Sequence, residues 1–362
     1  CSTTSAAERS LCVQIIEYPL RTGTVLFASL LLSACGEDAP DPSGAEASTY
    51  ELAGAAMGTT WNIKVTNFPE DVDRLALRDD LEALMVSSER ALSTYLPGSD
   101  LSRFNTNPST DWISVSLELC TIVDVALELG RMSGGTFDVT VGPLVNLWGF
   151  GPDGSAVEPP SAEAIAAAME ATGHDKIETD CNERLVRKDH EDMYVDLSGW
   201  AKGLAVDELA ELLDTTGIDN YLVEVGGELR ARGHNSEGLK WSIAIEAPST
   251  SRRAPHAVVR VTDTSVATSG DYRNYFEHDG QHYSHMIDPR TGRPVTHNLA
   301  AVTVVHPSAA YADAMATALL VLGPDDGLAL ARELKLAAYL LVRNDATIEE
   351  LTTPEFDALN ES

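Results

Sequence analysis

The feature that most constrains the fold is an apolar helix with one acid inside it. Residues 308–323, SAAYADAMATALLVLG, place small and aliphatic side chains on nearly every face between an N-cap, Ser308, and a terminating Gly323. A helix that is apolar all round has to be buried in a larger core. Asp313 and Thr317 lie four residues apart on one face of it. An unpaired buried carboxylate costs several kcal/mol, so another group has to compensate Asp313.

Two interpretations of Asp313 and Thr317 remain open at this point. A carboxylate and a hydroxyl are hard oxygen ligands, which suit Mg²⁺ rather than zinc. Alternatively, the carboxylate of Asp313 accepts hydrogen bonds from the backbone N–H groups of a neighbouring loop.

The remaining sequence predicts one mixed α/β (α+β) domain over residues 49–355, with a C-terminal tail over 356–362. Of 362 residues, 44% are hydrophobic, which is enough for a sizeable core. The net charge of −31 argues against nucleic-acid binding. The segments with helical periodicity are 70–93, 116–133, 161–172, 199–216, 308–322 and 325–334, and the strand-like segments are 60–68, 219–233, 241–248, 256–263 and 299–307.

The first 48 residues have the pattern of an export and anchoring segment. TVLFASLLLSAC after Arg21 is too short to span a bilayer and suits a signal peptide. Its end, LSAC, resembles a lipobox, which implies a signal segment over 1–34, cleavage before Cys35 and lipid attachment to that thiol. Residues 35–48 then form a flexible tether rich in Gly, Pro, Ser and acids. A short buried helix with a chance cysteine is the alternative.

Two cysteines, Cys120 and Cys181, remain beside Cys35 after such processing. In an oxidising compartment they can form a disulfide, although a buried free thiol at Cys120 fits its apolar surroundings equally well. No CxxC pair occurs, so a zinc or redox site is not expected.

Residues 196–217, DLSGWAKGLAVDELAELLDTTG, place Lys202 in the first turn of a helix. A cation there opposes the helix dipole at a cost of about 0.3–1 kcal/mol. Lysine near glycines at a helix N-terminus is typical of a phosphate site. The alternative is a lysine paired with Asp196 or Asp207.

Residues 284–295, SHMIDPRTGRPV, hold His285 and Asp288 three residues apart in a stiff turn. Histidine titrates near neutral pH and can act as a base, which Asp288 could orient. Polar turns without chemistry have a similar composition.

Two further stretches are ambiguous. Residues 134–151, GGTFDVTVGPLVNLWGFG, could border a flat aromatic ligand, although core packing explains the aromatic side chains equally well. Ser269, Gly270 and Asp271 form a turn whose N–H groups could bind an anion or serve the turn alone.

Seven motifs occur in a fixed order between residues 56 and 323: AMGTTW, FDVTVGPLVNLWGFG, DLSGWAKGLAVD, VEVGGELRARG, TSGDYRNYF, HMIDPRTGRPV and ADAMATALLVLG. This series closely resembles the ApbE family, the FAD:protein FMN transferases. The resemblance implies an enzyme that binds FAD and Mg²⁺, transfers FMN to a Thr or Ser hydroxyl of an acceptor protein through a phosphoester, and releases AMP.

The resemblance also assigns individual residues. The positions expected to contact FAD are Met57, Tyr95, Thr136, Phe137, Asp138, Asp196, Lys202 and Ile287. The metal ligands would be Asp313, Thr317 and the carbonyl of Gly199, and His285 matches the catalytic histidine. Some members carry a second acid where this chain has Ala316. Members that hydrolyse FAD tend to carry Asn in place of Tyr95, so Tyr favours transfer.

The family's acceptors are flavin-bearing subunits of the sodium-pumping NADH:quinone reductase and of Rnf-type complexes. The resemblance therefore favours the periplasmic side of the inner membrane in the bacterial cell envelope, whereas Gly36 after the lipidated cysteine favours the outer membrane. Two other functions stay open: a FAD pyrophosphatase that yields FMN and AMP, and a periplasmic flavin-binding lipoprotein without turnover.

Overall fold

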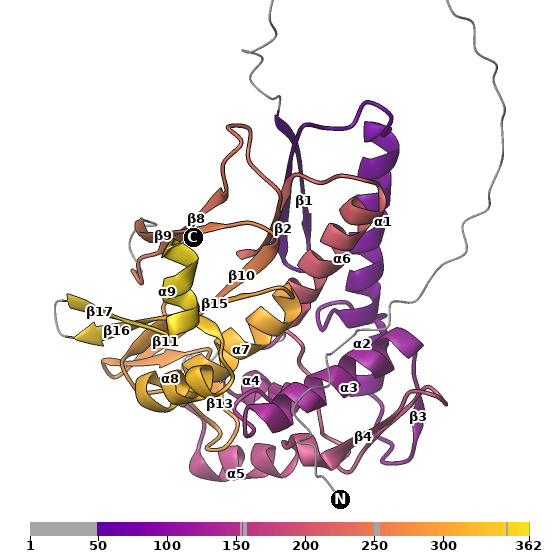
Figure 1. Cartoon of the computed structure of the whole chain (residues 1–362). Coiled ribbons are helices and arrows are strands. Elements are labelled where there is room, and N and C mark those ends of the chain that lie inside the picture. Colours follow the sequence, from indigo (N-terminus) through magenta and orange to yellow (C-terminus); the bar gives the residue numbers. More distant parts are fainter. Residues whose placement is uncertain (1–48, 153, 155–157, 250–253, 345–346, 362) are drawn as a thin grey trace, which may run out of the picture. The chain divides into compact units, whose positions relative to one another are not determined.

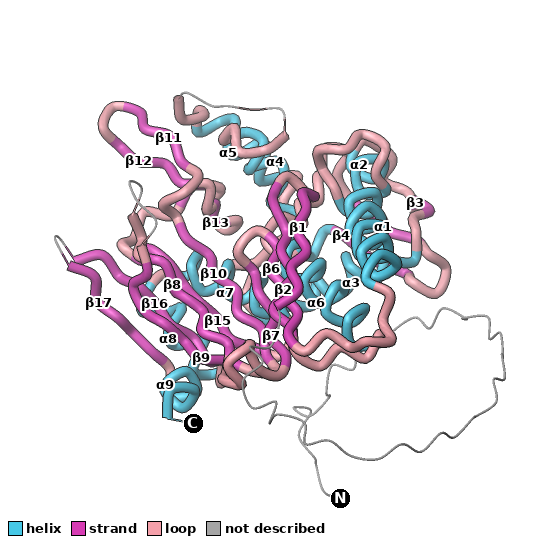
Figure 2. The backbone as a smooth tube through the Cα atoms, turned by 90° about the horizontal axis from the view of Figure 1, so that it is seen from above, coloured by secondary structure: helices cyan, strands magenta, loops and turns pink. Residues whose placement is uncertain are grey.

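An eight-stranded sheet is the centre of the fold (Figures 1 and 2). Every neighbouring pair of strands in it runs antiparallel. Figure 2 shows the strands following one another from β17 at one edge to β1 at the other. The order across the sheet is β1 (Thr49–Ala56), β2 (Thr59–Thr66), β6 (Tyr221–Val225), β7 (Glu228–Arg232), β10 (Thr264–Gly270), β15 (Leu299–His306), β16 (Ala337–Asn344) and β17 (Thr347–Thr352).

The computed structural model describes residues 49–152, 154, 158–249, 254–344 and 347–361. The predicted signal segment, the tether and the lipidation site Cys35 lie outside these residues. Within the described part of the chain, no helix is long and apolar enough to cross a membrane.

Three helices cover one face of the sheet: α7 (Ala309–Leu322), α6 (Ala201–Thr215) and α1 (Arg74–Leu92). Helix α7 packs on β10 and β15 and lies beside α6, which in turn contacts α1 (Figure 1). The predicted boundaries of the apolar helix are confirmed, because Ser308 Oγ accepts a hydrogen bond from the Tyr311 N–H and the helix ends at Gly323. Its aliphatic side chains belong to the largest core cluster.

The other face of the sheet is also covered. Along β15 the side chains of Val302 and Val304 join the core under α7, whereas Ala301 and Val305 pack in a separate cluster. The elements that complete this second cluster are the hairpin of β8 (Trp241–Glu246) with β9 (Pro255–Val261) and the helix α9 (Pro354–Glu361). Because both faces are packed, β15 reads as a continuous apolar run.

The predicted C-terminal tail over 356–362 is wrong. Residues 354–361 form α9, and Phe356 is 4% exposed and stacks on Tyr339 with the ring centroids 5.1 Å apart. Burial of an aromatic ring stabilises the last helix against the sheet.

The remaining elements form small sheets and further helices. A three-stranded sheet has the order β3 (Ile113–Ser114), β5 (Leu185–Lys188), β4 (Ile177–Asp180), and two-stranded ribbons are formed by β11 (Tyr275–His278) with β12 (Gln281–Ser284) and by β13 (Ile287–Asp288) with β14 (Arg293–Pro294). The other helices are α2 (Asp100–Asn105), α3 (Leu117–Met132), α4 (Gly142–Leu147), α5 (Ala162–Glu170) and α8 (Pro324–Glu333), with 3₁₀ turns at Val139–Val141 and His174–Lys176.

The predicted mixed class is confirmed, and the antiparallel pairing makes it an α+β fold. The residues Glu46–Ser362 form one compact unit. The single strand predicted over 219–233 is wrong: it is a hairpin of β6 and β7. Gly226 and Gly227 have φ angles of 60° and 109°, which only glycine adopts readily, and they turn the chain at that point.

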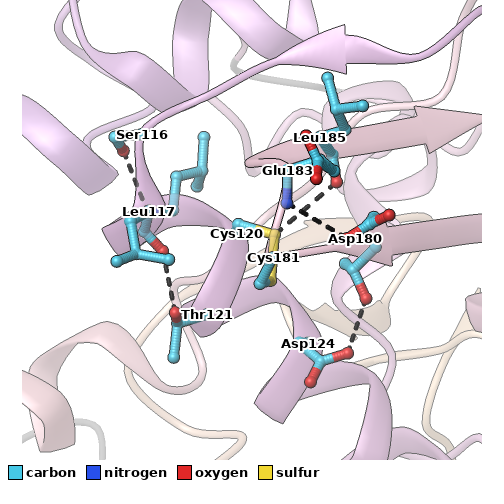
Figure 3. Close-up of a disulfide and its surroundings, with 11 residues drawn as sticks. Ser116, Leu117, Cys120, Thr121, Asp124, Asp180, Cys181, Glu183 and Leu185 are labelled. Carbon is cyan, nitrogen blue, oxygen red and sulfur yellow. Dashed lines mark hydrogen bonds between the residues drawn. A yellow bond between two sulfur atoms is a disulfide. The ribbon is translucent and has the colours of Figure 1, made fainter.

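A disulfide joins Cys120 in α3 to Cys181 at the end of β4 (Figure 3). The Cα atoms lie 5.5 Å apart, within the usual range for a disulfide. This decides between the two states that the sequence left open for Cys120. The bond fastens α3 to the three-stranded sheet across a sequence separation of 61 residues.

Reduction of this disulfide should destabilise the protein. Closing a loop of about 60 residues lowers the entropy of the unfolded chain enough to stabilise the folded state by about 4 kcal/mol. We expect dithiothreitol to lower the urea midpoint of the wild type and to leave that of a Cys120→Ser/Cys181→Ser variant unchanged. Equal midpoints of the wild type with and without reductant would contradict the prediction.

Candidate active site

A cleft of about 530 Å³ is lined by residues of α6, α7, the ends of β7 and β10 in the main sheet, β8 and β13. Most of the residues predicted from the sequence line it. They are Tyr95, Thr136, Phe137, Asp138, Asp196, Gly199, Lys202, His285, Ile287, Asp313 and Thr317. Met57 and Asp288 are not among the lining residues.

The buried carboxylate of Asp313 is compensated by a lysine from the neighbouring helix. Lys202 Nζ lies 3.3 Å from Asp313 Oδ2 and 3.2 Å from Glu228 Oε1. The backbone N–H of Gly203 also donates to Asp313 Oδ2 at 3.1 Å. Both carboxylate side chains are no more than 4% exposed, so Lys202 bridges two nearly buried acids.

This pairing identifies the partners of Lys202 and of Asp313 within the protein. Lys202 contacts neither Asp196 nor Asp207, which were the alternative partners, and Asp313 accepts a backbone hydrogen bond in addition to the ion pair. The carboxylate of Asp207 instead binds Arg230 and caps the N-terminus of α7 through Ala309 and Ala310.

Close contact between α6 and α7 places Lys202 beside Asp313. A Cβ atom at Gly203 would lie 2.4 Å from the Ala309 carbonyl oxygen, so only glycine permits this approach. One turn further along α6, the Asp207 carboxylate also joins the two helices, because it accepts hydrogen bonds from the N–H groups of Ala309 and Ala310 at the start of α7. The helix crossing therefore sets the register between the lysine and the acid.

The charges in this cluster perturb one another. Burial alone would lower the pKa of Lys202, but Asp313 and Glu228 outweigh it and raise that pKa. Burial raises the pKa of the Glu228 carboxyl to about 7, with Lys202 opposing the rise and Asp313 adding to it. Lys202 is consequently held as a cation inside the cleft.

Hydroxyl groups lie next to this cluster. Thr317 is one turn after Asp313 on α7, and its Oγ1 lies 3.1 Å from Ser269 Oγ on β10. Gly199 is adjacent, because a Cβ added there would be 3.3 Å from Thr317 Oγ1. Among the residues that the structure describes, no three His, Cys, Asp or Glu side chains gather as a metal site. The predicted ligands thus amount to one carboxylate with hydroxyl and carbonyl oxygens.

The imidazole of His285 has a defined tautomer. Its Nδ1 lies 3.0 Å from the carbonyl oxygen of Asn274, which can only accept, so Nδ1 carries the proton and Nε2 is basic. Burial lowers the pKa of His285 below its ordinary value of 6.5, and the nearby Lys202 adds to this. The imidazole is therefore neutral at pH 7.

The predicted role of Asp288 in orienting His285 is wrong. Its carboxylate accepts hydrogen bonds from the backbone N–H, Nε and Nη2 of Arg290, each at 2.9 Å. Asp288 therefore stabilises the turn, because a carboxylate two residues before an arginine closes a local hydrogen-bonded ring. The backbone of Asn274 has the orienting role that sequence reasoning gave to Asp288.

Comparison with known proteins gives the family. Residues 57–340 match the ApbE family. The chain belongs to the ApbE family. It is 41% identical over 337 residues to a FAD:protein FMN transferase of Vibrio cholerae, covering 93% of this chain and 98% of that one. The corresponding protein of Escherichia coli K12 is 40% identical over 336 residues, with 92% and 95% covered.

Solved ApbE structures have the same fold. The flavin transferase ApbE from Vibrio cholerae superposes with a TM-score of 0.80 at 40% identity, covering 86% of this chain and 99% of that chain. The apo form of the Pseudomonas stutzeri flavinyl transferase ApbE gives 0.79 at 40% identity, with 86% and 97% covered. The family resemblance inferred from the ordered motifs is confirmed.

Several predicted ApbE positions have a structural partner as well as a place in the cleft. Asp138 caps the 3₁₀ turn Val139–Val141 and accepts the backbone N–H of His174 at 2.9 Å. Asp196 accepts the backbone N–H and the hydroxyl of Ser198. Asp196 is therefore fixed by its own loop, and Asp138 by its own turn together with the segment that contains His174.

Two predicted flavin contacts differ in position. Tyr95 is 66% exposed at the edge of the cleft, so its ring is available to a ligand. Met57 lies in the β1–β2 turn with a φ of 54°, and its side chain packs against the core. The structure brings Tyr95 to the cleft and leaves Met57 outside its lining.

Among the lining residues that sequence reasoning missed are Glu228, Asn274, Glu246 and Arg273. Glu228 follows the glycine pair in the motif VEVGGELRARG, and a carboxylate directly after a turn was the available signal. Arg273 and Glu246 form an ion pair across the cleft wall. Nothing in the local sequence indicates that pairing, because their elements meet only in the folded chain.

The two candidate partners of His285 can be separated by titration. We expect Asp288→Asn to leave the pKa of His285 unchanged and below 6.5, because Nδ1 bonds the Asn274 carbonyl. Histidine-selective NMR over pH 4–9, with His285→Gln to assign the signal, measures it. A clear downward shift in the variant would restore Asp288 as the orienting group.

Proposed function

We propose that the chain is a FAD:protein FMN transferase, which moves FMN from FAD to the hydroxyl of a Thr or Ser side chain on an acceptor protein and releases AMP. The observation that carries the proposal is the neutral His285 imidazole in the same cleft as Lys202 and the hard oxygens of Asp313 and Thr317. A base, a fixed cation and oxygen ligands are what attack of a hydroxyl on a pyrophosphate requires.

The charge of the cleft favours a divalent cation. Five carboxylates line it, from Asp138, Asp196, Glu228, Glu246 and Asp313, against two cationic side chains, those of Lys202 and Arg273. An anionic pyrophosphate would be repelled by this surface unless additional positive charge accompanied it.

The oxygen atoms near Thr317 fit Mg²⁺. This ion is commonly held by one or two carboxylates together with water and substrate phosphates, so one acid suffices. Asp313, Thr317 and the carbonyl of Gly199 would hold it, and the absence of an acid at Ala316 leaves more positions for water or phosphate oxygen. When bound, the ion would neutralise charge on the pyrophosphate.

Residues of the protein would take up the proton and stabilise the charge of the leaving group. His285 Nε2 accepts the proton of the acceptor hydroxyl as its oxygen forms a bond to the phosphorus on the FMN side. The bond from that phosphorus to the bridging oxygen breaks, and AMP leaves with this oxygen and takes up the proton. Lys202 stabilises the negative charge that develops on the pyrophosphate, and the aromatic side chains of Phe137 and Phe150 border the space for flat rings.

We further propose a place and a partner. A lipid anchor at Cys35 with the tether 35–48 would hold the domain on the periplasmic side of the inner membrane. The acceptors would be flavin-bearing subunits of a sodium-pumping NADH:quinone reductase or an Rnf-type complex. Their modified hydroxyls would reach the cleft from the membrane surface.

The decisive experiment incubates the purified protein with FAD and Mg²⁺, with and without an acceptor that carries a modifiable Thr. Covalent flavin fluorescence on the denatured acceptor, with an equal amount of AMP, supports transfer. FMN and AMP formed without acceptor would indicate a pyrophosphatase instead. Bound FAD that stays intact in both tubes would point to a flavin-binding protein without turnover.

His285→Ala should reduce transfer at least about 10²-fold, the usual contribution of a general base, and leave FAD binding unchanged. In the wild type at saturating Mg²⁺ the rate should fall only at pH values below the ordinary histidine pKa of 6.5, since burial lowers the pKa of His285. Transfer rates and flavin fluorescence quenching measure the two effects. Wild-type turnover in the variant would remove the base role from His285.

Asp313→Ala should abolish the response of transfer to Mg²⁺ along with most of the activity. The variant removes the one carboxylate among the proposed ligands and leaves Lys202 paired with Glu228. Rates measured across a Mg²⁺ titration, with EDTA as the zero point, test this. Full activity of the variant in EDTA would exclude a cation at Asp313.

A further inference from the structure

We propose that Glu228 is a positioning residue that holds Lys202 aside when a divalent cation binds Asp313, and thereby sets the affinity of the cleft for that cation. This inference rests on the proposed function, in which Asp313 is a ligand. Glu228 belongs to none of the motif positions assigned from the family resemblance.

Lys202 and a divalent cation would compete for the carboxylate of Asp313. Lys202 Nζ lies 3.3 and 3.4 Å from its two oxygens, so the ammonium occupies the side of the carboxylate that faces the cleft. A divalent cation at the same oxygens would repel this ammonium strongly at such short range. Binding therefore requires that Lys202 has another partner within reach.

Glu228 is that partner, and its position does not depend on α7. Its Oε1 is 3.2 Å from Lys202 Nζ, while Oε2 accepts the backbone N–H of Thr268 at 3.1 Å. The carboxylate is thus fixed by the main sheet, on the strand next to β10. A Cβ atom at Gly226 would lie 3.0 Å from Lys202 Cδ, so this glycine keeps room for the lysine stem beside Glu228.

Asp313 keeps a hydrogen bond within the protein when Lys202 moves away from it. The Gly203 N–H still donates to its Oδ2 at 3.1 Å, so the carboxylate stays oriented. With both acids ionised the cluster of Lys202, Glu228 and Asp313 carries one net negative charge. Without the charge of Glu228 the lysine and Asp313 would form a neutral pair, and the cation would have to displace the lysine from its remaining partner.

The test measures binding of Mn²⁺, a paramagnetic substitute for Mg²⁺, through the EPR signal of the free ion at pH 8. We expect Glu228→Gln to weaken Mn²⁺ binding about tenfold or more. Glu246→Gln is the matched control, because it removes an equal charge from the cleft wall at a side chain paired with Arg273, away from Lys202. It should change the affinity far less.

A double-mutant cycle shows whether Glu228 acts through the lysine. In a Lys202→Met background, Glu228→Gln should change Mn²⁺ affinity less than about threefold, since no ammonium competes for Asp313. Lys202→Gln provides a second uncharged background if the Met variant does not fold, because its amide can still donate to a carboxylate. Circular dichroism confirms that each variant is folded.

Three outcomes would overturn the inference: wild-type Mn²⁺ affinity in Glu228→Gln, an equal loss in Glu246→Gln, or the same loss from Glu228→Gln with and without Lys202. In each case the wild type still binds the ion, and the proposed function stands. A wild type that binds no Mn²⁺, with or without FAD, would overturn the metal dependence and this inference together. The acceptor assay then decides whether transfer itself holds.

Discussion

The ion pair between Lys202 and Asp313 is the interaction on which the rest of the structure depends. An acid inside an apolar helix would be strongly destabilising without a partner, and the lysine comes from α6, which packs against α7. Gly203 permits that approach, and Asp207 caps α7 from the same helix. The contact between α6 and α7 therefore determines both the packing of the core and the charge of the cleft.

The position of this crossing also explains where the cleft lies. Helix α7 packs on β10 and β15, so Thr317 meets Ser269 at the end of β10, where the chain leaves the sheet. The segment that follows β10 then supplies the Asn274 carbonyl that orients His285. A buried pair on two helices is thus connected through one strand to His285. Rigid elements hold each of these groups, which suits chemistry that depends on fixed charges.

The cleft has an acidic surface, and the partners of its carboxylates determine its electrostatics. The lining carboxylates have partners within the protein: Asp138 accepts the His174 N–H, Asp196 is held by its own loop, and Glu246 pairs with Arg273. Glu228 and Asp313 share one lysine between them. Two acids therefore face one cation, and with both acids ionised this corner of the cleft keeps a net negative charge.

The sequence by itself determined several of the helices and strands and most of the candidate site. Helical periodicity and caps predicted α6 and α7 within a few residues, and the ordered motifs gave the family, because these signals are local. Tertiary structure alone decided the partners: Glu228 for Lys202, Asn274 rather than Asp288 for His285, and Cys181 for Cys120. It also showed that Phe356 belongs to the core. The local sequence does not indicate which distant residues will be in contact, since this depends on how helices and strands pack. Asp288 is near His285 in the sequence, but its carboxylate binds Arg290, which is nearer still.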